Sequence, residues 1–282
     1  MKTFPNCKIN LGLHVIRRRD DGYHDLETLF LPVPLCDELE IEPADSFSFI
    51  QEGIAIDGDC NQNLVVRAYR LMQLELGSSI KPVAIRLRKN IPFGAGLGGG
   101  SSDAAFTLKM INELFDLGLP NSELRQLASR LGADCPFFID NVPAFATGIG
   151  DCLEPLGYNP LQYHKIMLVK PDTAVSTADA YRGITPRDKR VDKGISLRDV
   201  LAMPMHEWRN NLVNDFEESV FTKYPNLGEI KNRFYSAGAI YASMSGSGSS
   251  VFGIFNNDTD IDNLDLETNC LGIFEYDFNK IS

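Results

Sequence analysis

The stretch NIPFGAGLGGGSSDAAFTLKMINELF, residues 90–115, decides how this chain is interpreted. Five of the seven residues from 94 to 100 are glycine, and they lead into a segment with apolar residues at helical spacing. A loop without side chains lets backbone N–H groups approach an oxyanion, and the N-terminus of the following helix favours negative charge. The segment predicts a phosphate-binding loop; a flexible hinge or a close helix–strand contact is the structural alternative.

Two known phosphate motifs fit this loop only in part. The dinucleotide-binding spacing G-x-G-x-x-G begins at Gly94, but Pro92 and Phe93 separate it from the preceding strand-like segment. The acidic residues in the window of the second strand fall instead at the end of the same predicted helix. The P-loop pattern also begins at Gly94, but Gly100 stands where its lysine belongs. The sequence therefore predicts a phosphate loop of another kind.

Composition and charge narrow the class of partner. The chain has 282 residues, of which 44% are hydrophobic and 23% charged, as in ordinary globular proteins of one large or two moderate domains. Lys and Arg number 27 against 38 Asp and Glu, and a net charge of −11 repels a polyanion at long range. We expect no nucleic-acid partner. A small phosphate ligand stays compatible with this charge, because backbone N–H groups bind it locally.

Targeting, membrane and metal signals are weak throughout the sequence. The N-terminus has no uninterrupted apolar core of the signal-peptide kind, and no stretch approaches the roughly 20 apolar residues of a membrane span. We therefore expect a cytoplasmic protein with no membrane partner. The six cysteines form no C-x-x-C pair and the four histidines are widely spaced, which predicts reduced thiols and no structural transition-metal site.

Hydrophobic periodicity predicts a mixed α and β chain. In the first half, strands are expected at 7–17, 38–50 and 83–89, and helices at 63–76, 101–115 and 122–132. In the second half, we expect a strand at 165–171, an exposed loop at 182–196, helices near 197–208 and 226–237, and strands at 243–255 and 271–279. The predicted domains are 1–155 and 156–270, and the last strand, 271–282, belongs to either.

Three motifs together resemble those of the GHMP kinases, the superfamily of galactokinase, homoserine kinase and mevalonate kinase. They are the glycine loop, the strand Lys8-Ile9-Asn10-Leu11, and a second glycine-rich turn, Met244-Ser245-Gly246-Ser247-Gly248-Ser249-Ser250, in the order of that family. The resemblance implies an α+β fold with an ATP-binding N-terminal domain, a substrate-binding C-terminal domain and a cleft between them. It also implies ATP with Mg²⁺, whose ligands the sequence does not identify beyond a hydroxyl such as that of Ser102. The loop residues that would bind ATP are Pro92, Phe93, Gly94, Ala95, Gly96, Leu97, Gly98, Gly99, Gly100, Ser101 and Ser102.

The resemblance also implies a catalytic pair, Lys8 and Asp134. Asp134 lies in the segment Gly132-Ala133-Asp134-Cys135-Pro136, and the residues alone favour the N-cap of a helix that has Pro136 in its first turn. In the family context Asp134 is instead the base that takes the hydroxyl proton, and Lys8 holds it ionised. Without the resemblance, Lys8 would be read as a lysine at a strand edge.

Within the superfamily, Asp21-Gly22-Tyr23-His24 resembles the branch whose alcohol substrate carries a cytidine group. By that resemblance, Tyr23 and Tyr181 would stack on the two faces of the base and His24 would read its edge, whereas aromatic packing on a hydrophobic edge is the bland alternative. Two further residues, Asn10 and Thr177, would lie near the substrate, and Asn63 and Lys89 near the adenine of ATP. The leading hypothesis is a small-molecule kinase of this branch. The alternatives are a homoserine- or mevalonate-type kinase, or a nucleotide-binding regulatory module, which could dispense with Lys8 and Asp134.

Overall fold

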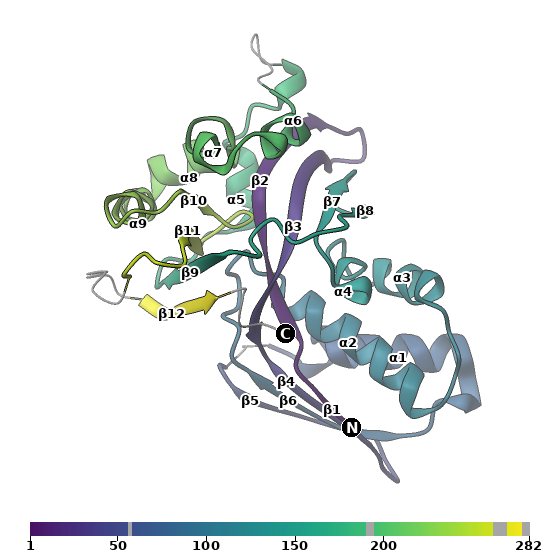
Figure 1. Ribbon diagram of the computed structural model, residues 1–282. Coiled ribbons are helices and arrows are strands. Elements are labelled where there is room, and N and C mark those ends of the chain that lie inside the picture. The colour runs from purple at the N-terminus through teal and green to yellow at the C-terminus, as the bar shows by residue number, and fades with distance from the viewer. Residues whose placement is uncertain (56–57, 190–194, 262–269, 278–282) are drawn as a thin grey trace. The chain divides into compact units, whose positions relative to one another are not determined.

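The computed structural model describes residues 1–282 except 56–57, 190–194, 262–269 and 278–282, and the chain divides into two units (Figure 1). The first unit comprises Met1–Lys8, Pro32–Phe93 and Gly98–Val142. The second comprises Ile9–Leu31, Gly94–Leu97 and Pro143–Ser282. The chain therefore passes between the units several times, and the glycine loop itself is shared by both.

The first unit is a four-stranded sheet with helices. Its strands, in the order β1-β4-β6-β5, are β1 (Lys2–Thr3), β4 (Glu38–Pro43), β6 (Val83–Lys89) and β5 (Ser48–Gly53). Its helices are α1 (Leu64–Leu76), α2 (Gly99–Leu114), α3 (Asn121–Ser129) and α4 (Phe137–Asp140), with short 3₁₀ turns at Cys60–Gln62 and Gly77–Ser79. α1 and α2 lie side by side (Figure 1), and α2 also contacts β4, α3 and α4. α2 is thus central to this unit.

The second unit contains a sheet of the order β10-β11-β9-β12 with helices against it. The strands are β9 (His164–Pro171), β10 (Tyr241–Met244), β11 (Val251–Asn256) and β12 (Cys270–Asp277). The helices are α5 (Thr177–Arg182), α6 (Leu197–Ala202), α7 (Met205–Asn211), α8 (Glu217–Lys223) and α9 (Pro225–Ser236), with a 3₁₀ turn at Arg187–Lys189. α9 packs on β10 and β11 through Leu227, Ile230 and Phe234, which are fully buried.

A third sheet has the order β2-β3-β7-β8. Its strands are β2 (Asn6–Arg18), β3 (His24–Cys36), β7 (Ala144–Thr147) and β8 (Cys152–Pro155). The sequence predicted β2 but gave no sign of β3, because Pro32 and Pro34 lack an N–H and weaken a strand assignment. In β3 both prolines lie on its less buried side, while Leu31, Val33 and Leu35 alternate with them and are buried.

The remaining differences from the predicted elements have local causes. The helix expected near 197–208 is two helices, α6 and α7, separated at Pro204, which is the N-cap of α7. The strand expected at 38–50 ends at Pro43, and β5 begins only at Ser48. Part of the loop expected at 182–196, residues 190–194, lies outside the described residues. The sequence left the allegiance of the last strand open; β12 pairs antiparallel with β9, within the second unit.

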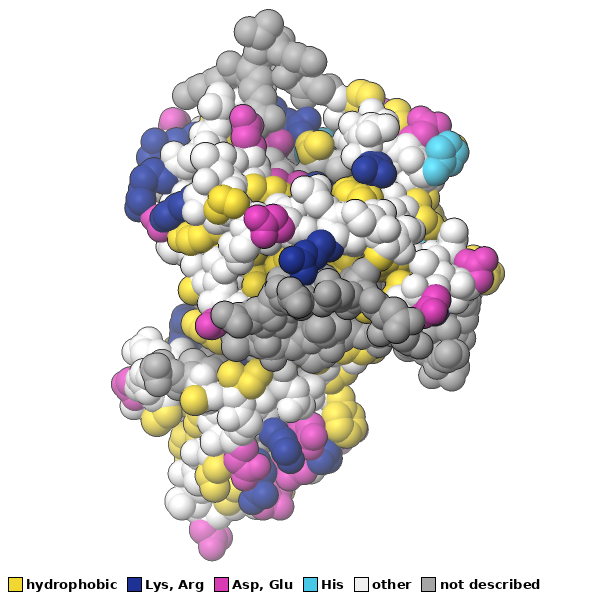
Figure 2. All heavy atoms as spheres, turned by 90° about the vertical axis from the view of Figure 1, so that its left-hand side faces the viewer, with side chains coloured by type: hydrophobic (Ala, Val, Ile, Leu, Met, Phe, Trp, Pro, Cys, Tyr) yellow, Lys and Arg dark blue, Asp and Glu magenta, His cyan; other side chains and the backbone are white. Residues whose placement is uncertain are grey.

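The cysteines whose side chains the structure describes are all free thiols. They are Cys7, Cys36, Cys60, Cys135 and Cys152, and the side chain of Cys270 is not described. Among the helices of the described residues, none is long and apolar enough to cross a membrane. Acidic and basic side chains are interspersed on the face drawn in Figure 2.

Candidate active site

The glycine loop joins β6 to α2, and its backbone uses conformations that suit glycine. Gly94, Gly96 and Gly98 all have φ between +62° and +74°. Gly98 is the N-cap of α2, and no side chain caps that helix end. The first backbone N–H groups of an α-helix have no acceptor within that helix. The N–H groups of residues 99–101, at the start of α2, therefore have no acceptor within α2. With the helix dipole, they form an anion-binding helix start.

Two of these glycines are also required by packing. A Cβ at Gly98 would lie 3.1 Å from the Phe138 ring and 3.2 Å from Cε of Lys8. A Cβ at Gly99 would lie 2.8 Å from Cγ2 of Ile91. Gly100 differs, because it is exposed and a Cβ there would meet only Leu64, at 3.6 Å. The close helix–strand contact that the sequence left as an alternative therefore coexists with an open helix start at Gly100.

Lys8 and Asp134 come together although 126 positions separate them in the sequence. Nζ of Lys8, on β2, lies 3.6 Å from Oδ2 of Asp134, in the turn before α4. The Lys8 side chain is 5% exposed and that of Asp134 is 33% exposed. α4 begins at Phe137 with Pro136 as its N-cap and no side-chain capping bond, so Asp134 does not cap it. Of the two interpretations of Asp134, the helix cap is therefore wrong.

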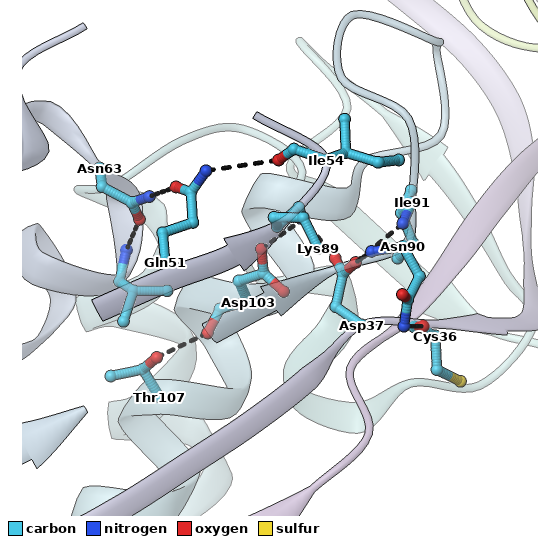
Figure 3. A network of polar contacts seen from close by, with 11 residues as sticks. Cys36, Asp37, Gln51, Ile54, Asn63, Lys89, Asn90, Ile91, Asp103 and Thr107 are labelled. Atoms are coloured by element: carbon cyan, nitrogen blue, oxygen red, sulfur yellow. Dashed lines mark hydrogen bonds and ion pairs between the residues drawn. The ribbon is translucent and has the colours of Figure 1, made fainter. Parts of the chain in front are cut away.

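Lys89 lies in a buried polar network with two carboxyl groups (Figure 3). Its ammonium group donates to Oδ2 of Asp37 and, at 2.6 Å, to Oδ2 of Asp103, and all three side chains are at most 3% exposed. Burial, together with the neighbouring Asp37, raises the pKa of Asp103 to about 8 although Lys89 opposes the shift. Burial alone would lower the pKa of Lys89, but the two carboxylates raise it. A contact between Lys89 and adenine stays a prediction.

Asn63 and Ser102 are two further polar residues predicted for the ATP side. Asn63 is the N-cap of α1: its Oδ1 accepts from the backbone N–H of Val65 at 2.9 Å, and its Nδ2 donates to Gln51 (Figure 3). Ser102 is fully buried in the first turns of α2, and its hydroxyl has no hydrogen-bond partner among the described residues. A buried hydroxyl without a partner is costly, so a ligand at the helix start would relieve it.

No group of three or more His, Cys, Asp and Glu side chains that could hold a metal ion occurs among the described residues. Mg²⁺ in kinases is held by one or two protein oxygens, several waters and the substrate phosphates. The buried hydroxyl of Ser102, which has no partner among the described residues, fits a metal that arrives with a nucleotide.

In the second unit, the glycine-rich turn at 245–250 is fixed against the middle of the glycine loop. Oγ of Ser245 donates to the carbonyl of Gly96 at 2.9 Å, and the N–H of Ser250 donates to the carbonyl of Ala95 at 3.2 Å. A Cβ at Gly96 would lie 2.1 Å from the Ser245 carbonyl oxygen, so only glycine allows this approach. Asn214 also holds the turn, because its Nδ2 donates to the carbonyl of Met244, the last residue of β10, and to that of Gly246, each at 2.8 Å.

Asn10 and Thr177, both predicted to lie near the substrate, contact this same turn. Oδ1 of Asn10 lies 3.4 Å from the position of a Cβ at Gly246, and its Nδ2 donates to Oγ1 of Thr28. The hydroxyl of Thr177 lies 3.0 Å from that of Ser247. The structure thus gathers these two residues at one glycine-rich turn.

The three residues predicted to bind a pyrimidine base lie differently from one another. His24 stacks on Tyr181, with ring centroids 4.6 Å apart and an interplanar angle of 21°. Phe216 packs edge-on against Tyr181 at 4.8 Å. Tyr23, in the turn between β2 and β3, is 61% exposed. Burial, and then the charge of Arg18, lowers the pKa of His24, so its ring is neutral at pH 7 and carries one donor and one acceptor.

Sequence reasoning missed Asp37 and Asp103, which hold the two ends of the glycine loop through Lys89, and Asn214, which binds the turn at 245–250. One signal was available: Val83, Ile85 and Leu87 alternate along β6 and are buried, so Lys89 continues the buried face and requires anions near it. No local pattern identifies which anions, because Asp37 lies 52 positions away in the chain.

Comparison with known proteins supports this description. The family model of the GHMP kinases N terminal domain matches residues 63–148, and that of the GHMP kinases C terminal domain matches residues 199–264. The chain is 50% identical over 271 residues to the 4-diphosphocytidyl-2-C-methyl-D-erythritol kinase of Bacteroides fragilis, covering 95% of this chain and 96% of that protein. It is 48% identical over 270 residues to the protein of the same name from Parabacteroides distasonis, covering 96% and 97%.

Solved structures resemble it as well. The crystal structure of a 4-(cytidine 5'-diphospho)-2C-methyl-D-erythritol kinase aligns with a TM-score of 0.76 at 36% identity, covering 90% of each chain. The mevalonate kinase of Methanococcus jannaschii aligns with a TM-score of 0.71 at 14% identity, covering 98% and 97%, which is a likeness of fold alone.

Proposed function

The chain belongs to the GHMP kinases, and from this premise we propose that it transfers the γ-phosphoryl group of ATP to the 2-hydroxyl of 4-diphosphocytidyl-2-C-methyl-D-erythritol, in non-mevalonate isoprenoid biosynthesis. The observation that carries the proposal is the pair of Lys8 and Asp134, in a chain about half identical over nearly its whole length to kinases named for that substrate. A homoserine- or mevalonate-type kinase is the alternative, and its support is the fold alone.

The chemistry asked of the protein is positioning and electrostatic stabilisation, because phosphoryl transfer has a loose transition state. Asp134 is partly exposed, so a hydroxyl can reach its carboxylate and give up its proton there. Lys8, almost fully buried, pairs with that carboxylate and offers a positive charge to the transferring group. Backbone N–H groups from the glycine loop and the start of α2 bind the phosphates.

Mg²⁺, when bound with ATP, would neutralise charge on the phosphate oxygens. The free hydroxyl of Ser102 is the protein group that we assign to it. The other loop residues predicted for ATP, 92–101 together with Asn63 and Lys89, complete the proposed nucleotide site. We also propose cytoplasmic location and the absence of nucleic-acid and membrane partners.

Recognition of cytosine would use Tyr23, His24 and Tyr181. The 4.6 Å separation of the His24 and Tyr181 rings leaves no room for a base between them, so a base stacked on that face of Tyr181 requires His24 to move aside. A neutral His24 at the base edge has one donor and one acceptor to offer. Asn10 and Thr177 would hold the rest of the substrate near the turn at 245–250.

The test is ADP release from ATP with 4-diphosphocytidyl-2-C-methyl-D-erythritol, homoserine and mevalonate as acceptors. We expect efficient turnover with the first alone. We also expect CMP to compete with the acceptor more strongly than UMP, because exchanging an amino donor for a carbonyl leaves a site group unpaired. Efficient phosphorylation of homoserine or mevalonate, without inhibition by CMP, would establish the alternative kinase instead.

A further inference from the structure

Resting on the ATP site proposed above, we infer that Asp37 is a positioning residue that fixes the entry of the glycine loop so that the loop can bind the triphosphate of ATP. Asp37 lies between β3 and β4, fully buried, and is not itself part of the loop. It acts through the backbone of Asn90 and Ile91, the two residues that precede Pro92.

Two sets of bonds tie Asp37 to that segment, and a third ties its neighbour Cys36 to it. Its Oδ1 accepts from the backbone N–H of Asn90 at 2.6 Å and of Ile91 at 2.8 Å. Its Oδ2 accepts from Nζ of Lys89, the last residue of β6 (Figure 3). In the same turn, the carbonyl of Cys36 accepts from Nδ2 of Asn90 at 3.0 Å. The two neighbouring residues 36 and 37 therefore hold three consecutive residues, 89–91, at and just after the end of β6.

Lys89 extends this hold to the other end of the loop. Its ammonium group also donates to Oδ2 of Asp103, in the second turn of α2, at 2.6 Å. The strand end and the helix start on which the loop depends are thus joined through a single cation. Because the groups are buried, these charge-assisted bonds are strong and little screened by salt.

The two carboxylates are not equivalent, and this difference supplies a matched test. Asp37 uses both oxygens: Oδ1 serves the backbone and Oδ2 serves Lys89. Asp103 uses only Oδ2 for Lys89, and its buried Oδ1 has no hydrogen-bond partner. An asparagine has one acceptor oxygen. Asp103→Asn can therefore keep the bond to Lys89, whereas Asp37→Asn must give up either the backbone N–H groups or Lys89.

The experiment measures ATP affinity by calorimetry, and KM for ATP and for the acceptor separately, in Asp37→Asn and Asp103→Asn, well below their unfolding temperatures. Both changes remove one buried carboxyl group beside the same lysine. We expect Asp37→Asn to weaken ATP binding and raise KM for ATP by tenfold or more, with KM for the acceptor nearly unchanged. We expect Asp103→Asn to change ATP affinity by less than about twofold.

Asn90→Ala supplies a second variant that leaves the buried charges intact, in case Asp37→Asn does not fold. It removes only the side-chain bond to the carbonyl of Cys36, and we expect KM for ATP to rise about threefold. Equal effects of Asp37→Asn and Asp103→Asn on ATP affinity would overturn the inference, as would unchanged ATP binding in folded Asp37→Asn or, if that variant does not fold, in Asn90→Ala. Wild-type protein that binds ATP but does not phosphorylate the proposed acceptor would refute the acceptor alone. Wild-type protein that binds no ATP would overturn both.

Discussion

The first unit contains two lysine–aspartate associations, built from the same residue types, and they differ in what they leave free. Lys89 is enclosed by Asp37 and Asp103, with every partner at most 3% exposed. Lys8 faces Asp134 at 3.6 Å, a longer separation, and a third of the Asp134 side chain stays accessible. A buried cluster of this kind holds backbone in place, whereas a longer pair with one accessible carboxylate leaves a carboxylate oxygen that a substrate can reach. The same two residue types therefore serve architecture at Lys89 and, in the function that we propose, reaction at Lys8 and Asp134.

The largest expected effect is a difference in the free energy of unfolding that is lost when each of the two lysines is replaced. Lys89→Met leaves two carboxyl groups buried without their cation, so we expect a loss of about 3–5 kcal/mol in the free energy of unfolding. Lys8→Met leaves Asp134 in contact with water, so its loss of stability should stay near 1 kcal/mol, while turnover falls strongly. Urea unfolding of both variants measures this. Similar losses of stability for the two would abolish the distinction.

The second effect concerns the accessible carboxylate. Asp134→Asn keeps the size of the side chain and removes the base, so we expect turnover to fall roughly 10²-fold or more, which corresponds to about 2.7 kcal/mol in the transition-state free energy. The measurement is kcat at saturating ATP and acceptor, with circular dichroism as the control for folding. A variant with near-normal kcat would show that Asp134 has no part in the proton transfer.

A third effect is the pH dependence of the buried cluster. The pKa of Asp103 is raised to about 8 by burial, well above its ordinary value near 4, so the folded protein keeps a proton that the unfolded chain releases. Its contribution to stability is therefore fully present below pH 4 and is lost as the pH rises toward 8. The slope is at most about 1.4 kcal/mol per pH unit.

Asp103→Asn has no such proton, so the difference in unfolding free energy between wild type and Asp103→Asn should change steadily from pH 5 to pH 8. A difference independent of pH in that range would contradict the shifted pKa.

The smallest effect concerns the open helix start. Gly100→Ala places a methyl group where only Leu64 lies within 4 Å, so the variant should fold and gain about 0.5–1 kcal/mol of stability from better helix propensity. The same methyl group should hinder the approach of a phosphate to the backbone and weaken ATP binding severalfold. Gly98 and Gly99 are poorer probes, because a Cβ there meets neighbouring atoms at about 3 Å or less. If Gly100→Ala is stabilised but its ATP affinity is unchanged, the phosphates of ATP do not bind at this helix start.

Most helices and strands followed from local patterns, and the exceptions have physical causes. Alternation predicted β6, a short apolar run predicted β9, and helical spacing predicted α1, α2 and α9. β3 was not predicted, because its prolines break the strand pattern. The strand tolerates these prolines because they lie on its less buried side. Hydrophobic periodicity indicates which face of a helix or strand is buried. It does not reveal a strand whose residues, such as proline, disfavour strand structure.

The sequence by itself determined the family, the glycine loop that opens α2, and the identity of Lys8 and Asp134 as candidates, because contiguous motifs carry these. Only the tertiary structure excluded the helix cap at Asp134 and paired this carboxylate with a lysine 126 positions away, since the first depends on where α4 begins and the second on how the chain folds. It also enclosed Lys89 between Asp37 and Asp103 and fixed the turn at 245–250 against Gly96. Buried charges must find partners of opposite sign, but folding brings those partners from anywhere in the chain, so only the folded structure names them.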